Sequence, residues 1–165
     1  ILLMVLHIAL GALSLLGVGH YTMRQLAWVL MAFVGAHVFI STILTIKAIY
    51  IGIKTKTFYF KDNILFWVRR ISGFVLILFL YLHIHAFTYT VEGSVRLSYF
   101  GVYKLVTGIC FVLSIAVHIL SNIRPLYTAL GKKASTLTSV LFFISALLFF
   151  AAAALIIYYF RWNAA

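Results

Sequence analysis

Apolar stretches of about 20 residues recur along the chain and are separated by short polar gaps. They cover residues 1–18, 26–49, 64–91, 102–123 and 137–160. Each can cross a bilayer as a helix, because a helix rises about 1.5 Å per residue and the hydrocarbon core is roughly 30 Å thick. Hydrophobic residues fill 65% of the 165 positions, which excludes a water-soluble globule. The sequence predicts one all-α membrane domain, residues 1–165, with five transmembrane helices, the first expected to be incomplete because the sequence begins inside an apolar stretch.

Few residues are available for conventional catalysis. Asp62 and Glu92 are the only carboxylate residues, which excludes paired-carboxylate hydrolysis, carboxylate-bridged di-iron centres and acid-rich calcium sites. Cys110 is the only cysteine, so disulfide frameworks, cysteine-ligated iron–sulfur clusters and the covalent attachment of c-type haem are excluded as well. Any chemistry must come from other residue types.

The basic residues indicate how the helices are oriented. Thirteen Lys and Arg give a net charge of +11, but they lie in short gaps rather than on one face, which argues against a nucleic acid partner. Nine of them fall within residues 47–70 and 124–133, and the other four lie in the remaining gaps. The positive-inside rule therefore places residues 47–70 on the cytoplasmic or matrix side. We also expect Pro125 to end the fourth helix, because proline lacks the N–H group that a helix requires.

Histidines at membrane depth are the candidate functional residues. Ionisable groups there are costly and usually face the interior of a helix bundle. Those that fall centrally in four different stretches are His7, His37, His83 and His118. Counted from flanking charges, His37 and His118 share one depth, and His83 lies roughly 7–11 Å nearer the outer face. His7 agrees with the level of His83 to about one helical turn.

Two histidine levels predict two metal cofactors. Imidazole is the commonest metal ligand, and a haem needs only two axial ligands from the protein. Gly73 and Gly108 each lie ten positions before a central histidine, and they indicate clearance for planar groups. The residues just before them, Ser72 and Thr107, lie near the same helix face as those histidines. Arg69 lies near the same helix face at the inner end, where a guanidinium can pair with a haem propionate.

Simpler roles for these residues stay open at this point. Small residues also allow close packing of membrane helices, and a histidine can hydrogen-bond to a neighbouring helix instead of to a metal. His85 lies about 200° around the helix from His83, so the two cannot face one cofactor. His20 is expected at the headgroup boundary, close to Tyr21 and Arg24.

The sequence Phe-Trp-Val-Arg-Arg-Ile-Ser-Gly at residues 66–73, followed by His83, resembles a known membrane protein family. It is similar to the Trp-x-x-x-x-(Ser/Thr)-Gly…His segment in the cytochrome b subunit of succinate:quinone oxidoreductases, the succinate dehydrogenases and fumarate reductases. A histidine on each of the first four of five spans is similar to the five-helix, di-haem branch. The resemblance implies an outer haem b on His7 and His83, and an inner haem b on His37 and His118. With the helix geometry above, the candidate cofactor-binding residues are Trp67, Arg69, Arg70, Ser72, Gly73, Thr107, Gly108 and Arg124.

The resemblance also implies a function and partners. The chain would be the subunit of a respiratory-chain complex that does not bind the dicarboxylate. It would pass electrons between a quinone (menaquinone or ubiquinone) and the flavoprotein and iron–sulfur subunits. The complex could assemble into a higher oligomer. Two axial histidines close both haem positions, which favours electron transfer over oxygen binding. A bacterial or archaeal cytoplasmic membrane is favoured over the mitochondrial inner membrane. Ala116 stands where well-studied relatives have a glutamate, and the first loop, on which they carry another glutamate near the outer quinone site, is very short here. Their proton route and their quinone-site assignment therefore do not transfer to this chain.

Two other interpretations stay open. The cytochrome b subunit of a membrane hydrogenase, formate dehydrogenase or nitrate reductase also holds haems between helices. The Arg-Ile-Ser-Gly sequence at residues 70–73 and the presence of one central histidine per helix argue against it. A transporter or assembly protein whose histidines only join helices is the alternative from a different class.

Overall fold

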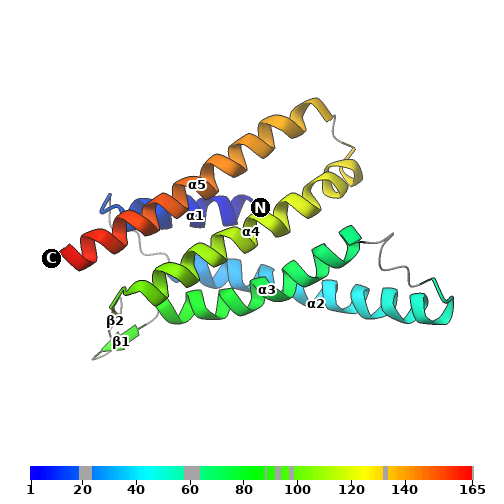
Figure 1. Ribbon diagram of the computed structural model, residues 1–165, viewed down its shortest axis with the longest axis horizontal. Coiled ribbons are helices and arrows are strands. Elements are labelled where there is room, and N and C mark those ends of the chain that lie inside the picture. Colours follow the sequence, from blue (N-terminus) through cyan, green and yellow to red (C-terminus); the bar gives the residue numbers. More distant parts are fainter. Residues whose placement is uncertain are drawn as a thin grey trace.

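The computed structural model is an all-α bundle, as the sequence predicts, and it describes residues 1–18, 24–57, 64–87, 89–91, 94–96, 99–131 and 134–164. Its helices are α1 (Leu2–Leu15), α2 (Arg24–Lys54), α3 (Ile64–Phe87), α4 (Val102–Ala129) and α5 (Ala134–Ala164). Successive helices run in opposite directions along one long axis (Figure 1). Four of them, α2 to α5, are long and apolar enough to cross a membrane, whereas α1 is an apolar helix of 14 residues.

One end of the bundle is strongly basic. At this end α2 finishes, α3 starts and α4 finishes (Figure 1). The described residues that give it its charge are Lys47, Lys54, Lys56, Arg69, Arg70 and Arg124. We call it the basic end, and we call the end that holds Gly17, Tyr99 and Arg161 the opposite end.

The third helix is shorter than the sequence predicts. The apolar stretch runs to residue 91, but α3 ends at Phe87. Strand β1 (Tyr89–Val91) follows and pairs antiparallel with β2 (Ser94–Arg96), so that Tyr89 lies opposite Arg96. Tyr, Thr and Val favour extended backbone, and hydropathy alone does not register this preference. The segment therefore forms a small hairpin at the opposite end of the bundle (Figure 1).

Pro125 does not end the fourth helix, so that prediction is wrong. Helix α4 continues through Pro125 to Ala129. Proline cannot donate a hydrogen bond to the carbonyl group four residues earlier, which belongs to Ser121. The Arg69 side chain of α3 supplies the missing donor, because its Nε lies 2.8 Å from the Ser121 carbonyl oxygen. A freed carbonyl group in a membrane helix is tolerated when a neighbouring helix satisfies it in this way.

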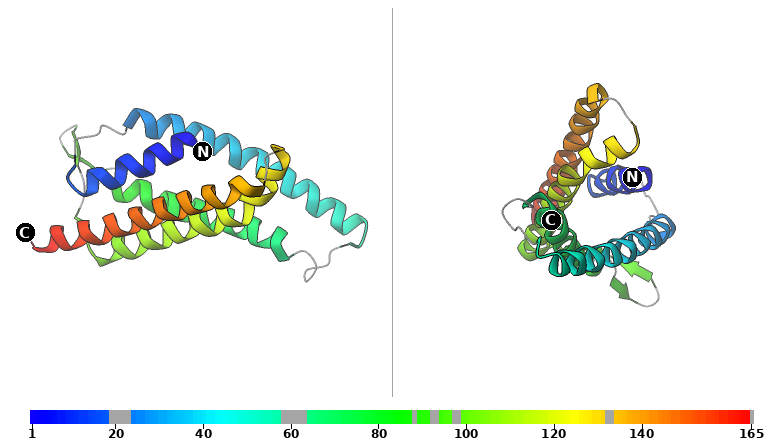
Figure 2. Two further views of the ribbon diagram at one scale, coloured as in Figure 1. Left: turned by 90° about the horizontal axis from the view of Figure 1, so that it is seen from above. Right: turned by 90° about the vertical axis from the view of Figure 1, so that its right-hand side faces the viewer.

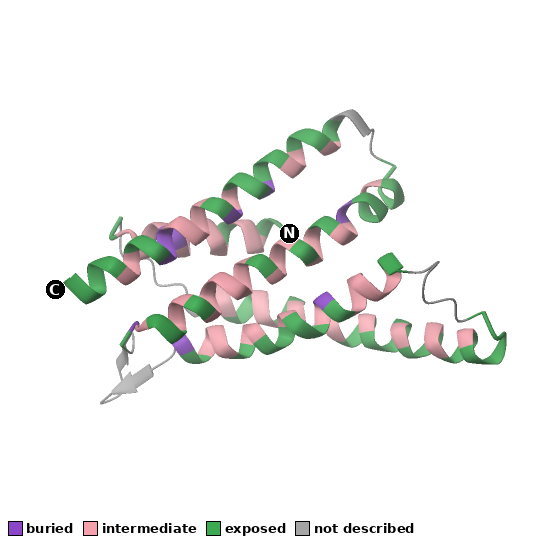
Figure 3. Cartoon of the chain, in the orientation of Figure 1, coloured by how far each residue is buried: buried purple, intermediate pink, exposed green. Residues whose placement is uncertain are grey.

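The helices do not pack equally closely. Helix α3 packs on α4, α4 on α5 and α1 on α5, while α1 meets α2 at fewer points. The buried cluster of Ile123, Ile144 and Leu148 lies between α4 and α5, and the buried positions in Figure 3 are concentrated away from α2. No described side chain of α2 is buried, and Figure 2 shows this helix at the edge of the bundle. The inward side of α2 is therefore only partly covered by the described part of the chain.

A side chain from α5 holds the end of α1 in place. Gly17 has a φ of 79°, and the Val18 N–H donates to the Leu13 carbonyl oxygen at 2.9 Å, as in a glycine-terminated helix. The guanidinium of Arg161 donates through Nη1 to the carbonyl oxygen of Leu16 at 2.7 Å. A cation at the carboxyl end of a helix also interacts favourably with the helix dipole. Helix α1 is thereby fixed to α5 at the opposite end.

Candidate functional site

The structure brings the four central histidines together in two pairs. The ring of His7 on α1 lies 6.3 Å from that of His83 on α3, measured between centroids, with an interplanar angle of 76°. The rings of His37 on α2 and His118 on α4 are 6.2 Å apart with an angle of 81°. The two pairs therefore have nearly the same geometry, although they are formed by four different helices.

Each pair joins helices that do not pack closely through their backbones. The close contacts are α3 with α4, α4 with α5 and α1 with α5, and neither α1 with α3 nor α2 with α4 is among them. The imidazoles of each pair therefore meet between helices whose backbones do not lie close together. A flat cofactor held by one side chain from each of two helices requires such a separation.

The ring separation excludes a direct hydrogen bond within either pair. A ring nitrogen lies only about 1.1 Å from the centroid, so nitrogens of rings 6.2 or 6.3 Å apart are at least about 4 Å from each other, beyond the roughly 3.2 Å of a hydrogen bond. By contrast, one metal ion bound to both rings at about 2.0 Å would separate the centroids by about 6.3 Å. The distances in both pairs therefore fit a single metal ion between two imidazoles.

The donor set restricts the kind of metal centre. Within the described residues, no three His, Cys, Asp or Glu side chains are grouped so that they could hold a metal ion. Each histidine pair can supply only two ligands, so the remaining ligands would have to come with the metal. A haem meets this requirement, because the porphyrin provides the in-plane nitrogens and leaves the two axial positions to the protein.

The first pair, His7 and His83, lies beside an aromatic ring of α4. The ring of Phe111 on α4 lies against His83, with centroids 5.0 Å apart and an interplanar angle of 33°. The Nδ1 atom of His7 is buried and has no hydrogen-bond partner among the described residues. Leaving a buried polar atom unsatisfied costs about 1–3 kcal/mol, and Nδ1 of His7 joins no described residue of another helix by a hydrogen bond. Phe111 was not among the predicted site residues, although its spacing of seven residues from His118 places both on one face of α4.

The second pair has a different environment. His37 is exposed on α2, in the middle of an apolar helix, and His118 is half-buried between α3 and α4. The Nδ1 atom of His118 lies 3.1 Å from the hydroxyl oxygen of Ser72, which is buried. A Cβ atom added to Gly73 would lie 3.6 Å from Cε1 of His118, so the ring packs directly against the backbone of α3. The predicted candidates Ser72 and Gly73 therefore lie beside the second pair.

The basic and aromatic candidates lie at the basic end. Arg69 binds the Ser121 carbonyl oxygen, and the Arg70 guanidinium lies over the ring of Phe66 at 5.0 Å. The Nε atom of Arg70 is buried without a hydrogen-bond partner among the described residues. Trp67 contacts Phe66 edge-on, with ring centroids 5.5 Å apart, and Arg124 is exposed. These residues therefore gather at the basic end, on the side of the second pair.

The remaining candidates have local roles. The Thr107 hydroxyl donates to the Tyr103 carbonyl oxygen at 2.9 Å within α4. A Cβ atom on Gly108 would lie only 3.2 Å from Cδ1 of Leu155, so this glycine allows α4 and α5 to pack closely. His85 is exposed and contacts Tyr81, with ring centroids 4.4 Å apart. His20, Asp62 and Glu92 lie outside the described residues.

The two pairs lie at different depths in the bundle. Ser72 is beside His118, and His83 follows Ser72 by eleven residues on α3, which corresponds to about 16 Å. Phe111 is beside His83 and precedes His118 by seven residues on α4, which corresponds to about 10 Å. The levels are therefore separated by about 10–16 Å along the bundle, with the second pair nearer the basic end.

Comparison with known proteins leaves this site to be interpreted from its geometry. No family model, no curated protein and no solved structure matches the chain.

Proposed function

We propose that the chain is a di-haem cytochrome b that transfers electrons within a membrane. The observation that carries the proposal is the pair of imidazole separations, 6.3 and 6.2 Å, between helices that do not pack closely on each other. They are too long for hydrogen bonds and suit one metal ion each, and the described residues offer no third ligand. In this proposal His7 and His83 hold one haem b, and His37 and His118 hold the other.

The residues around the pairs suit this role. A haem b with two histidine ligands has both axial positions closed and carries one electron at a time. His7, His83 and His118 are partly buried among the apolar helices, and the exposed His37 would be covered by the macrocycle. Arg69 and Arg70 lie at the basic end, the side nearer the second pair, where their guanidinium groups can meet haem propionates.

We propose more specifically the membrane subunit of a succinate dehydrogenase or fumarate reductase. Support for this finer assignment comes from the sequence between Trp67 and Gly73 with His83 ten residues later. A lipid-soluble quinone would exchange electrons with the haems, and the flavoprotein and iron–sulfur subunits would carry out the reaction on the dicarboxylate. The basic end would face the cytoplasm or matrix and bind these subunits, which agrees with its excess of positive charge.

The haem content of the purified chain tests the proposal. We expect a reduced-minus-oxidised spectrum typical of haem b, and two haems per chain. Replacing His118 with alanine should remove one haem and leave the other, and replacing His7 should remove the haem that the His118 variant retains. His85→Ala is the matched control, because His85 is exposed and should leave both haems in place. A wild-type chain purified without any haem would favour a transporter or assembly protein.

The partner subunits require a second experiment. Purification through a tag on this chain should recover a flavin-containing protein together with an iron–sulfur protein. Recovery of a hydrogenase, formate dehydrogenase or nitrate reductase instead would leave the di-haem assignment intact and overturn the succinate dehydrogenase assignment. Alanine substitutions at Lys47, Lys54 and Lys56 should weaken recovery of the partners, and unchanged recovery would show that the basic end is not the docking surface.

A further inference from the structure

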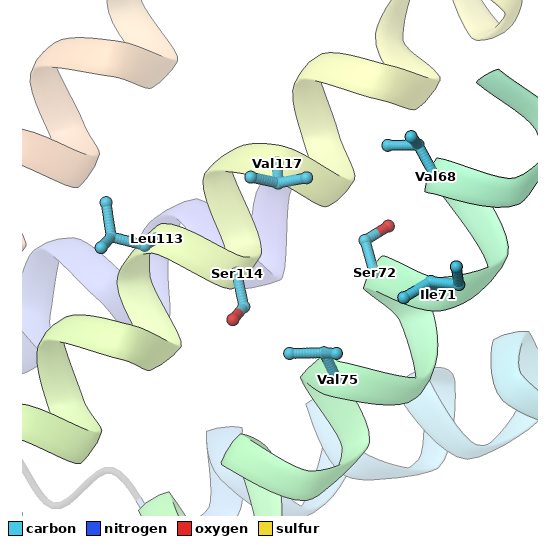
Figure 4. A pocket seen from close by; sticks show the side chains of 7 residues that line it. All are labelled: Val68, Ile71, Ser72, Val75, Leu113, Ser114 and Val117. Carbon is cyan, nitrogen blue, oxygen red and sulfur yellow. The ribbon is translucent and has the colours of Figure 1, made fainter. Parts of the chain in front are cut away.

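Ser72 lies between α3 and α4, the two helices that pack most closely. It lies on α3, faces α4 and is the one buried polar residue among the described side chains. Its hydroxyl oxygen is 3.1 Å from the carbonyl oxygen of Arg69 and 3.1 Å from Nδ1 of His118. Figure 4 shows Ser72 on α3 and Ser114 on α4, which line the same cavity of about 320 Å³ from opposite sides.

The hydrogen bond of Ser72 to Arg69 bears on how its hydroxyl meets His118. A serine hydroxyl has one proton, and the carbonyl oxygen of Arg69 can only accept. With this proton donated to the Arg69 carbonyl oxygen, the Ser72 oxygen can only accept a hydrogen bond from the imidazole of His118. In this arrangement the imidazole proton is on Nδ1, and Nε2 of His118 keeps a free lone pair. Neutral imidazole in this form is the one that binds a metal through Nε2.

We infer that Ser72 is a positioning residue for His118, an inference that rests on the proposed haem function. It holds the imidazole in the Nδ1-protonated form and fixes the orientation of the ring, so that Nε2 is available to the metal shared with His37. Groups that accept a hydrogen bond from a metal-ligating histidine set its tautomer and make it a stronger ligand. Helix α3 therefore supplies an axial ligand, His83, to one pair and the orienting hydroxyl to the other.

The first pair lacks an equivalent arrangement on α1. Nδ1 of His7 has no hydrogen-bond partner among the described residues, whereas Nδ1 of His118 has Ser72. An imidazole that donates from Nδ1 gives more electron density to the iron and stabilises the oxidised form. Ser72 should therefore lower the midpoint potential of the haem between His37 and His118.

A Ser72→Ala variant in the full chain tests this role. We expect one haem midpoint potential to shift upward while the other stays unchanged, and the shifted haem should be bound up to about tenfold more weakly. Ser72→Thr keeps a hydroxyl and should restore the wild-type potential. Ser114→Ala is the matched control, because Ser114 lines the same cavity but donates to the Cys110 carbonyl oxygen at 2.7 Å. The unshifted haem of the Ser72→Ala variant reports that the bundle is folded.

The results separate this inference from the proposed function. Two haems with unchanged potentials and unchanged affinity in Ser72→Ala would overturn the role of Ser72 and leave the di-haem assignment standing. An equal shift in Ser114→Ala would show that the cavity, rather than the hydrogen bond to His118, is responsible. Absence of haem from the wild-type chain would overturn the proposed function, and the role of Ser72 with it.

Discussion

The contact between Arg69 and the Ser121 carbonyl oxygen allows a quantitative prediction about the stability of the bundle. Pro125 removes the N–H that would otherwise satisfy this carbonyl group, and Arg69 replaces it from the neighbouring helix at 2.8 Å. Replacing Arg69 with leucine keeps only the apolar first part of the side chain and leaves the carbonyl oxygen without that donor. The variant should therefore be less stable than the wild-type chain.

The size of the effect follows from the type of hydrogen bond. Bonds from charged donors contribute about 1.5–3 kcal/mol, and a buried acceptor left without a partner costs about 1–3 kcal/mol. We expect Arg69→Leu to lower the free energy of unfolding by about 2 kcal/mol. Replacing Pro125 with alanine returns a backbone N–H to α4, so in the Pro125→Ala background the same Arg69→Leu change should cost about 1 kcal/mol less.

Unfolding of the four proteins in mixed detergent micelles measures this coupling as a double-mutant cycle. Distant sites usually add within about 0.5 kcal/mol, so a coupling of about 1 kcal/mol is resolvable. Loss of a contact between Arg69 and the proposed haem would not be recovered by Pro125→Ala, which separates that proposed role from the hydrogen bond to Ser121. Strictly additive effects of the two substitutions would refute the idea that Arg69 compensates for Pro125.

Three further substitutions test individual contacts. Phe111→Ala removes the ring that lies against His83, and it should shift the potential of the proposed haem at His7 and His83 while leaving the other proposed haem unchanged in a redox titration. Gly108→Ala places a Cβ 3.2 Å from Leu155 and should destabilise the packing of α4 on α5 by about 1 kcal/mol; a Leu155→Ala background should relieve that cost, and equal costs in both backgrounds would contradict it. Gly17→Ala forces a side chain into the left-handed region and should lower the unfolding free energy by about 1–2 kcal/mol in the same micelle assay, whereas no change would show that the end of α1 can rearrange.

Residue counting along the sequence predicts the order of the histidine levels, because the helices run along one axis of the bundle. The levels of the central histidines and the four long spans follow from the positions of apolar and charged residues. Counting does not say which helices are neighbours, so the packing of Gly108 against Leu155 could not be foreseen. It also missed the continuation of α4 through Pro125, because the compensating donor comes from Arg69, 56 positions earlier in the chain.

The hydrogen bond of Ser72 and the ring of Phe111 illustrate a second limit. Both residues lie on helices that carry a histidine of their own, yet each contacts the histidine of a neighbouring helix. Such contacts depend on the rotation of α3 and α4 about their axes, and a uniformly apolar sequence leaves this rotation undetermined. The small residue at position 73 was a usable signal, because it marks a place where another group approaches the backbone.

Helix α5 carries no histidine, but it contacts α1, which carries His7 of the first pair, and α4, which carries His118 of the second. By packing on both helices, α5 helps to set the distance between the two proposed electron carriers. Since tunnelling rates fall steeply with distance, side chains of α5 that touch neither carrier should still tune how fast one reduces the other.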